Sequence, residues 1–537
     1  MVWDFECDTL IAGSGGGALT GAYVAASEGL DTLVIESTDK FGGTTCYSGG
    51  AVWLPGNQAS RRDGLDDTND TALEYFQTVV GDRTPRDLQR AFVRNGPNVV
   101  EYLERSPHLN FFWFAFPDYY GDIGCPPAHA RGRDVLTMPI PSAELAEFQG
   151  KVRLSMGHDI MGYEEPEPIG GGRALVGRLL LAGRDAGVRY ELNSALESLI
   201  VEDGRVVGAN VTRNGRPARI HARKGVLLAA GGFERNQAMR DEFGVAGSAE
   251  WSAGAPGGLG QAIRAGMAIG AATDLMSEAW FMPGLIQPNG RSAFIAAVNG
   301  GIIVNAAGER FGNETGPYDR FGRKMRAGNA TGVSHVPAWW IWDASLGASV
   351  PSCAISMPVL DFADYERDGL WFQGETLADL AGKIGVSADG LGSTVHRFNG
   401  FCETGVDGDF HRGETPYDIY IARELPAVMG GTTNLPLGDP NPCLIPLATG
   451  PFYAAKVGLG DLGSKGGLKT DAGSRVLRPD GSVIPGLYAA GDSMAAASGE
   501  HYPAPGTPIG SCMVFSYLAA MDMAAGVQPR LAEVSFA

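Results

Sequence analysis

A tyrosine and a glycine stand four residues apart in the stretch "HYPAPGTPIG", residues 501–510. Pro503 and Pro505 stiffen the chain that follows Tyr502, because proline fixes one backbone dihedral. Gly506 presents a backbone N–H with no side chain in its way. Together these residues offer a phenol hydroxyl and an amide to one oxygen atom, which is the donor set that stabilises negative charge on a carbonyl oxygen.

A helix is expected directly after this pair. Thr507 is a good N-cap and Pro508 suits the first helical position, so we predict a helix that continues through "IGSCMVFSYLAAMDMAAG". Its sides are nearly all apolar, which predicts burial. The first amides of a helix have no partner inside it and carry partial positive charge, so this helix start would favour a negatively charged group.

The N-terminal stretch "CDTLIAGSGGGALTGAYVAASEGLDTLVIE" predicts a strand at Thr9–Ala12, a glycine turn, a helix and a second strand. Gly13, Gly15 and Ala18 occupy the GxGxxG/A positions, where small residues let the helix amides approach a pyrophosphate. Glu36 closes the second strand, where a carboxylate can accept hydrogen bonds from ribose hydroxyls. These features together predict a dinucleotide-binding site.

Further glycine-rich pieces lie at both ends of the chain. Gly42 and Gly43 leave a flat backbone that could lie against a ring system, and a predicted strand at Gly486–Ala489 leads to Gly491 and Asp492. This division resembles the flavoprotein subunit family of fumarate reductase and succinate dehydrogenase, which holds FAD across such a split site. The resemblance implies that Asp492 lies near the ribityl and diphosphate part of FAD.

The predicted FAD-binding residues therefore come from six segments. They are Gly13, Ser14, Gly15, Gly16, Gly17, Ala18, Glu36, Ser37, Gly42, Gly43, Thr44, Thr45, Ser48, Gly49, Gly50, Ala230, Gly231, Gly491, Asp492, Pro508 and Ile509. Cys46 stands in the region where some of these relatives attach FAD through histidine, so we predict noncovalent FAD. One residue departs from the family pattern. Relatives usually have a Gly-Asp-Gly motif at this point, and Leu259 stands in place of its acid.

Several tyrosine-bearing motifs indicate a more specific family within this group. The stretches "HYPAPGTPIGSCMVFSYLAA", "NETGPYDRFGRKM", "FPDYYGD" and "PFYAAKVGLGDLGSKGGLKTD" look like the 3-ketosteroid Δ1-dehydrogenase family. The resemblance implies that Tyr502 and the Gly506 amide of this chain bind the steroid C3 carbonyl. Tyr318 would remove a proton from C2, assisted by Tyr119, while hydride leaves C1 for flavin N5. An external acceptor, with a quinone expected from the family, would reoxidise the flavin.

A phenol that acts as a base must lose its own proton, although the reference pKa of tyrosine is about 10. A neighbouring donor or positive field must therefore help Tyr318 to ionise, and Tyr119 is the candidate neighbour. Trp280, Phe311 and Phe321 predict an apolar site around Tyr318. We expect Phe116 and Phe294 to line the steroid slot, with core packing as an alternative of equal weight.

The fold expected from these motifs is α/β, with a Rossmann-like FAD-binding domain that is discontinuous in sequence. The βαβ signature is absent between about Glu278 and Gly450. We therefore predict a first FAD-binding segment at 1–277, an inserted α+β catalytic or capping domain at 278–450, and a second FAD-binding segment at 451–537.

Net charge, cysteine pattern and the length of apolar runs limit the partners and the cellular location that we expect. A formal net charge of −19 repels phosphate backbones, which argues against nucleic acid. Seven scattered cysteines form neither a CxxC pair nor a Cys/His cluster, so we expect reduced thiols, a cytoplasmic protein and no metal site. Apolar runs are too short for a transmembrane segment, although peripheral contact with a membrane stays open.

Three other functions compete with this assignment. A sister flavoenzyme that dehydrogenates C4–C5 of a 5α-3-ketosteroid would use similar pieces, but both tyrosine motifs match the Δ1 pattern. A fumarate reductase-like enzyme needs cations for two carboxylates, and the inserted segment contains Arg320, Arg323 and His396. A flavin-binding protein without catalysis would need neither a base nor an aromatic pocket.

Overall fold

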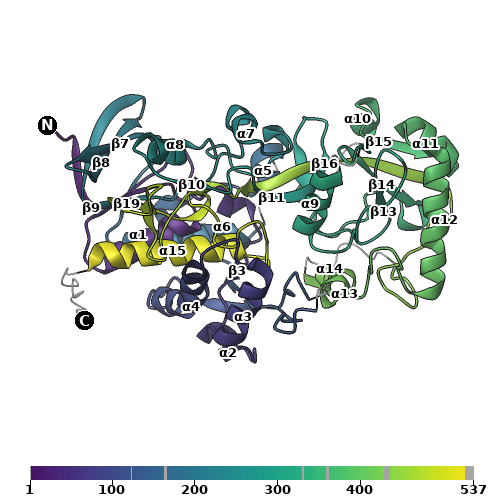
Figure 1. The fold of residues 1–537 in the computed structure, drawn as a ribbon, viewed down its shortest axis with the longest axis horizontal. Helices are drawn as coiled ribbons and strands as arrows, with labels where there is room; N and C mark the ends of the chain where they lie inside the picture. Colours follow the sequence, from purple (N-terminus) through teal and green to yellow (C-terminus); the bar gives the residue numbers. More distant parts are fainter. Residues whose placement is uncertain are drawn as a thin grey trace.

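The computed structural model describes residues 2–121, 124–162, 166–328, 332–357, 362–428 and 436–525. Two large sheets dominate the elongated molecule, one toward each end of Figure 1, and the long strand β16 runs between them. The mixture of a parallel sheet with helices confirms the predicted α/β class.

The first sheet carries the nucleotide-binding motif. Its strands follow the order β18-β19-β9-β1-β2-β6, and β8 also pairs with β9 and carries β7 on its other side. The bounds are β1 (Phe5–Ala12), β2 (Thr32–Ile35), β6 (Arg189–Glu191), β7 (Ser194–Glu202), β8 (Arg205–Arg213), β9 (Arg216–Leu228), β18 (Arg475–Leu477) and β19 (Val483–Ala489). Strands β19, β9, β1, β2 and β6 pair in parallel, so their carboxyl ends meet at one edge, where open α/β sheets bind ligands.

Two apolar helices pack together below this sheet in Figure 1. They are α1 (Gly16–Ser27) and α15 (Thr507–Ala524), which stand at opposite ends of the sequence. A Cβ at Gly17 would lie 2.8 Å from the Cys512 carbonyl oxygen, so glycine allows the close approach. Helix α6 (Gly171–Asp185) also packs on α1.

The predicted start of the last helix is wrong by one residue. Gly506 is the N-cap, with φ at 72°, and Thr507 and Pro508 take the first two helical positions. The Thr507 hydroxyl donates to the Ala504 carbonyl at 2.7 Å instead of capping a helix amide. A Cβ at residue 506 would lie 2.5 Å from the Ala51 carbonyl oxygen, so glycine is needed there. The predicted end at Gly526 lies outside the described residues.

The second sheet is antiparallel, in the order β12-β11-β16-β14-β13 with β15 also on β16. Its strands are β11 (Ala279–Ile286), β12 (Ser292–Phe294), β13 (Ile302–Val304), β14 (Ala338–Asp343), β15 (Trp371–Gly374) and β16 (Phe452–Ser464). The accompanying helices are α9 (Tyr318–Gly328), α10 (Phe362–Arg367), α11 (Leu377–Ile384), α12 (Ala388–Thr404), α13 (Pro416–Arg423) and α14 (Leu425–Val428). Strand β16 lies beyond the proposed boundary at 450, and the domain bounds stay a proposal.

Smaller elements complete the molecule. A three-stranded sheet contains β3 (Val52–Trp53), β4 (Phe111–Phe114) and β5 (Asp134–Thr137), and β10 (Thr273–Asp274) pairs with β17 (Gly467–Leu468). The remaining helices are α2 (Gln58–Arg62), α3 (Asn69–Val80), α4 (Arg86–Leu103), α5 (Met156–Met161), α7 (Gln237–Phe243) and α8 (Gln261–Ala268). Within the described residues, no helix is long and apolar enough to cross a membrane.

Candidate active site

One cavity of about 680 Å³ receives residues from both sheets. Of the predicted FAD-binding residues, all but Gly42 line it: Gly13, Ser14, Gly15, Gly16, Gly17, Ala18, Glu36, Ser37, Gly43, Thr44, Thr45, Ser48, Gly49, Gly50, Ala230, Gly231, Gly491, Asp492, Pro508 and Ile509. Tyr119, Tyr318, Tyr502, Gly506, Phe116 and Phe294 line the same cavity. Segments distant in the sequence are thus brought to one site.

The glycine turn after β1 is fitted to a nucleotide. A Cβ at Gly13 would lie 2.2 Å from the Ala229 carbonyl oxygen, so the turn and the end of β9 touch. The Ser14 hydroxyl donates to Glu36 Oε2 at 2.6 Å and accepts from the Gly42 amide at 3.0 Å. Gly42 therefore holds the turn in place from outside the cavity.

Two acids lie at this part of the cavity. Asp492 Oδ1 accepts a hydrogen bond from Trp280 Nε1 at 3.0 Å, and burial raises the pKa of Asp492 to about 6. Glu234, which the sequence analysis did not single out, is 2% exposed, and its Oε2 has no partner in the described chain. Burial, with Asp492 nearby, raises the pKa of Glu234 to about 8, so this carboxyl can donate a hydrogen bond to a bound cofactor.

Three tyrosines meet at the same cavity. The hydroxyls of Tyr318 and Tyr502 share a hydrogen bond of 3.1 Å. The Tyr119 ring packs edge to face on both, with centroid distances of 5.7 Å to Tyr318 and 5.3 Å to Tyr502. The Tyr119 hydroxyl has no hydrogen-bond partner with good geometry in the described chain. The three phenols form a compact cluster whose oxygens are available to a substrate.

Separate segments deliver these rings. Tyr318 begins α9, Tyr119 lies in the loop after β4, and Tyr502 lies in the segment before α15. The Tyr119 amide donates to the Pro503 carbonyl at 2.9 Å, which ties the second segment to the third. Next to Tyr119, the buried Asp118 forms an ion pair with the buried Arg133, which fixes this loop.

The environment distinguishes the three phenols. Burial raises the pKa of Tyr318 to about 12, although the hydroxyls of Tyr119 and Tyr502 both act to lower it. Burial together with the nearby Tyr318 phenol raises the pKa values of Tyr119 and Tyr502 well above the ordinary value. A phenolate is therefore least unfavourable at Tyr318, while Tyr119 and Tyr502 stay protonated donors.

Gly506 adds a backbone donor at the cavity wall. Its carbonyl accepts from the Trp53 amide at 3.2 Å, which fixes the peptide against β3. Its own N–H has no acceptor among the described residues. The Tyr502 hydroxyl and this amide can therefore both be offered to a ligand oxygen.

Apolar side chains make up much of the remaining wall. Phe294 packs edge to face on Tyr318 at 4.8 Å. Sequence reasoning missed other lining residues, since isolated apolar residues carry no distinctive signal: Phe114, Leu136, Met156, Ala296, Ala354, Ile355, Leu425 and Val428. Phe311 and Phe321 pack on each other outside the cavity, whereas Trp280 lines it. Leu259 is 40% exposed and does not line it, and His501 is half-buried.

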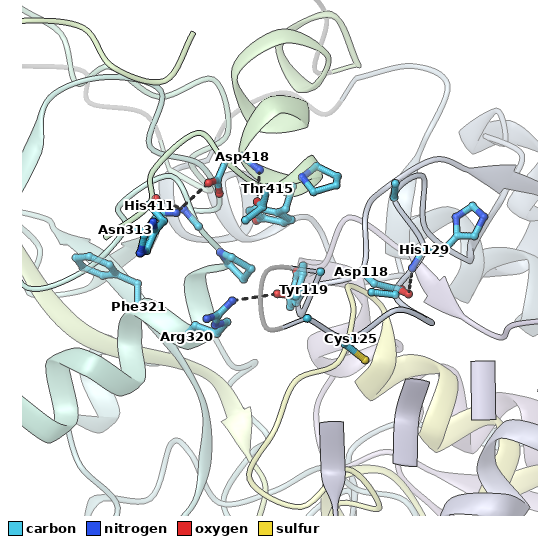
Figure 2. A pocket seen from close by; sticks show the side chains of 18 of the residues that line it. Asp118, Tyr119, Cys125, His129, Asn313, Arg320, Phe321, His411, Thr415 and Asp418 are labelled. Atoms are coloured by element: carbon cyan, nitrogen blue, oxygen red, sulfur yellow. Dashed lines mark hydrogen bonds between the residues drawn. The ribbon is translucent and has the colours of Figure 1, made fainter. Parts of the chain in front are cut away.

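A second hollow of about 350 Å³ lies on the other side of Tyr119 and is shown in Figure 2. Arg320, Lys324 and His411 line it together with Tyr417 and Asp418. Arg320 donates to the Tyr119 carbonyl at 3.3 Å. Tyr119 thus forms part of the wall between the two spaces.

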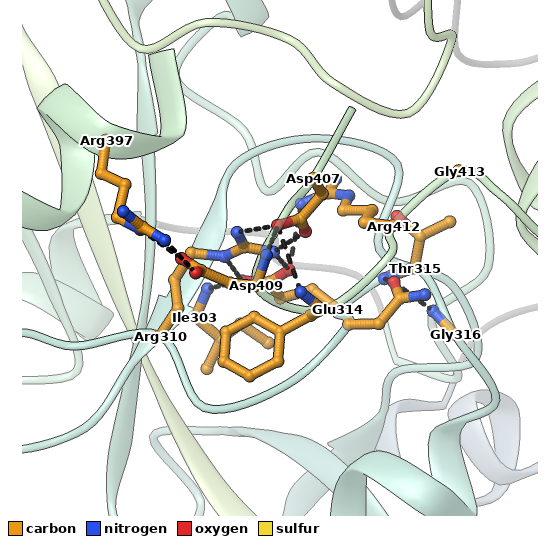
Figure 3. A network of polar contacts seen from close by, with 12 residues as sticks. Ile303, Arg310, Glu314, Thr315, Gly316, Arg397, Asp407, Asp409, Arg412 and Gly413 are labelled. Atoms are coloured by element: carbon orange, nitrogen blue, oxygen red, sulfur yellow. Dashed lines mark hydrogen bonds and ion pairs between the residues drawn. The ribbon is translucent and has the colours of Figure 1, made fainter. Parts of the chain in front are cut away.

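A buried ion network positions the start of α9, and Figure 3 shows its members. Arg310 pairs with Glu314 and Asp407 at 2.8 Å each, and Arg412 pairs with Glu314 at 3.3 Å. These four side chains are at most 4% exposed. Glu314 lies four residues before Tyr318, in the non-helical segment that leads into α9, so the network anchors the chain that enters the tyrosine cluster.

Removing Arg310 should be strongly destabilising, because Glu314 and Asp407 would keep buried charges with less compensation. We expect Arg310→Met to lower the free energy of unfolding in a urea titration by about 3–5 kcal/mol. The control is Arg397→Met, whose side chain is 61% exposed in its pair with Asp409, and which should leave the unfolding curve unchanged. Equal stability of the two variants would contradict the role given to the buried network.

Comparison with known proteins agrees with this geometry. Residues 8–509 match the family model described as FAD binding domain. A 3-oxosteroid 1-dehydrogenase of Rhodococcus opacus is 37% identical over 97% of this chain and 99% of its own length. A 4-oxocyclohexanecarboxylate 2-dehydrogenase of Sinomonas cyclohexanicum is 34% identical over 96% of this chain and 92% of its own length.

A solved structure is similar along nearly the whole chain. The 3-ketosteroid Δ1-dehydrogenase from Sterolibacterium denitrificans, in complex with 1,4-androstadiene-3,17-dione, has a TM-score of 0.87 and 34% sequence identity. The match covers 97% of this chain and 99% of that one. The predicted FAD cofactor and the predicted resemblance are confirmed, and the chain belongs to the FAD-binding flavoprotein family that contains the 3-oxosteroid 1-dehydrogenases.

Proposed function

We propose that this oxidoreductase removes two hydrogens from C1 and C2 of a 3-ketosteroid and leaves a double bond between those carbons. The observation that carries this proposal is the hydrogen-bonded pair of Tyr318 and Tyr502 at the cavity that belongs to FAD. One phenol of this pair is suited to act as base, and the other is suited to donate to the ketone.

Carbonyl activation falls to Tyr502 and Gly506. Both present an N–H or O–H at the cavity wall, and hydrogen bonds to the C3 oxygen stabilise the charge that develops there as C2 loses its proton. The high pKa of Tyr502 keeps its hydroxyl protonated and able to donate.

Proton removal falls to Tyr318. Its phenolate takes the proton from C2, and the Tyr119 hydroxyl favours the charged form, which offsets part of the rise in pKa that burial causes. The one hydroxyl proton of Tyr502 is then left for the ketone. FAD, when bound, supplies the acceptor for the hydride that leaves C1. The proton and the hydride account for both hydrogens lost from the substrate.

The wall chemistry favours a neutral, apolar substrate over a carboxylate. Arg153 is the one Lys or Arg among the described lining residues, and it pairs with Asp159 and donates to Thr38 beside Glu36. Arg320, Arg323 and His396, weighed for dicarboxylates, do not line the cavity. The substrate carboxylate named for the Sinomonas relative would find no free cation among the described wall residues.

The proposed reaction is tested by anaerobic addition of androst-4-ene-3,17-dione to the purified yellow holoenzyme. We expect flavin absorbance to bleach, with a 1,4-diene-3-ketone as product in mass spectrometry. A C4–C5 dehydrogenase cannot oxidise this substrate, because its C4–C5 bond is already unsaturated. Bleaching by the saturated 5α-3-ketone alone would favour that alternative, and failure of every 3-ketosteroid to bleach would contradict the proposal.

We also propose that FAD is held noncovalently. The Cys46 thiol is 1% exposed and does not line the cavity. Cys512 does line it, but burial raises the pKa of its thiol to about 12, which disfavours the reactive thiolate. The intact mass of the denatured protein should equal that of the polypeptide alone, and an added flavin mass would contradict this.

Substitution of the two bonded tyrosines should separate their roles. We expect Tyr318→Phe to abolish steroid-dependent flavin reduction while FAD stays bound, because no phenolate remains. Tyr502→Phe should slow flavin reduction by about 10²- to 10³-fold, the usual effect of removing one oxyanion donor. Stopped-flow absorbance of variants with verified FAD content measures both rates.

The pH dependence provides the control for this assignment. Below its pKa, the phenolate fraction of Tyr318 grows about tenfold per pH unit, so flavin reduction in the wild type should accelerate as pH rises. A near-normal rate in Tyr318→Phe, or a wild-type rate independent of alkaline pH, would refute the base assignment.

For reoxidation we retain a quinone as the proposed acceptor, which rests on the resemblance alone. Cytoplasmic location is proposed from the cysteine pattern, which predicts reduced thiols, and peripheral membrane contact stays open. Rates of reoxidation by a quinone and by oxygen, measured on the reduced enzyme, test the first proposal.

A further inference from the structure

A buried lysine lies directly after β16, beside the tyrosine cluster and outside the proposed chemistry. Lys465 is 0% exposed, although lysine is almost never fully buried without a specific partner. Its backbone is fixed on both sides, because its amide donates to the Glu278 carbonyl at 2.9 Å and its carbonyl accepts from the Ala496 amide at 3.1 Å. The direction of this side chain is therefore well defined.

The ammonium binds the chain that leads into Tyr502. Lys465 Nζ donates to the carbonyl of Glu500 at 2.9 Å and to the carbonyl of His501 at 2.7 Å. These are the two peptide oxygens immediately before Tyr502. Lys465 thus fixes the main chain of the residue that we assign to the substrate carbonyl.

The same ammonium also supports the Tyr502 ring indirectly. Lys465 Nζ lies 3.9 Å from the centre of the Trp280 ring, and Trp280 packs against the Tyr502 ring at 4.8 Å. Trp280 is held in turn by its hydrogen bond to Asp492. Trp280 therefore lies between the ammonium and the phenol, and both the main chain and the ring of Tyr502 depend on Lys465.

We propose that Lys465 is a positioning residue, which fixes the Tyr502 phenol in the orientation needed for its hydrogen bond to the substrate carbonyl. The inference rests on the proposed function, and it extends that function to a residue that does not touch the substrate. A small displacement of the donor would weaken the hydrogen bond just where the charge develops.

Opposing effects of burial and of nearby charges act on the protonation of Lys465. Burial lowers its pKa to about 7. Asp319 from α9, Glu278 before β11 and Asp492 after β19 favour the charged form, whereas Arg323 from α9 opposes it. The neutral amine still has two N–H donors for the two carbonyls but loses its attraction to Trp280. A methionine at this position removes both the N–H donors and the charge, whereas a glutamine removes only the charge.

The test is a double-mutant cycle between residues 465 and 502 in the holoenzyme. Lys465→Met keeps the aliphatic stem but removes the charge and the N–H donors, and it is combined with Tyr502→Phe. Flavin reduction by saturating androst-4-ene-3,17-dione gives the rate, and perturbation of the flavin spectrum gives the steroid dissociation constant. Lys469→Met is the matched control, since this exposed lysine lies four residues further along the chain.

The expected result is a loss of the Tyr502 contribution. In the wild type and in Lys469→Met, the hydroxyl of Tyr502 should accelerate flavin reduction by about 10²- to 10³-fold. In Lys465→Met that factor should fall below about tenfold, with a smaller change in the steroid dissociation constant. The cycle isolates positioning, because a general structural effect would slow the forms with and without the hydroxyl equally.

An unchanged factor in Lys465→Met overturns the proposal. If that variant loses FAD, Lys465→Gln, which keeps N–H donors without the charge, replaces it with the same expected direction. Loss of FAD from both variants also overturns the proposal, because Lys465 would then support the cofactor site as a whole. Absence of bleaching in the wild type would instead contradict the proposed function.

Discussion

The proposed active site depends on three buried phenol rings that pack against one another. Tyr318 and Tyr502 share a hydrogen bond, and Tyr119 packs on the edges of both rings. Each ring is at most 9% exposed. Because the rings are packed on one another, the position of each hydroxyl is set by the segments that carry it.

Burial makes ionisation of the proposed base Tyr318 unfavourable, and the tyrosine cluster offsets part of this cost. Burial alone would keep all three phenols protonated, but two neighbouring hydroxyls act on Tyr318 to favour its charged form. Tyr119 and Tyr502 receive no comparable help, so their surroundings distinguish the proposed base from the proposed donors, although all three are tyrosines. The surrounding supports follow from this division: the Arg310 network fixes the approach to Tyr318, and the Arg133–Asp118 pair fixes the loop of Tyr119.

Much of this arrangement could be predicted from the sequence, for identifiable reasons. The turn around Gly13 and the acid at Glu36 have fixed spacing within one βαβ unit, so local sequence is sufficient to place them. The tyrosine motifs could be assigned by resemblance to a family, and the structure brings all three to one cavity. The helix start was misplaced because Thr507 is a good cap by residue type, whereas the close approach of Ala51 to Gly506 is a tertiary contact.

Other features have no signal in the sequence. Glu234 and Lys465 matter because of what surrounds them, and their partners lie on other elements of the chain. Strand β16 crosses between the two parts of the molecule, which a boundary drawn at 450 from the absence of the βαβ signature could not reveal. The apolar wall is likewise assembled from single residues of many segments.

The most direct measurement is a crystal structure of the oxidised enzyme with a bound 3-ketosteroid. The account predicts the C3 oxygen within about 3 Å of both the Tyr502 hydroxyl and the Gly506 amide, the normal range for hydrogen bonds, with the Tyr318 hydroxyl facing C2. A steroid bound with its C3 oxygen away from residues 502 and 506, or with Tyr318 remote from C2, would contradict it.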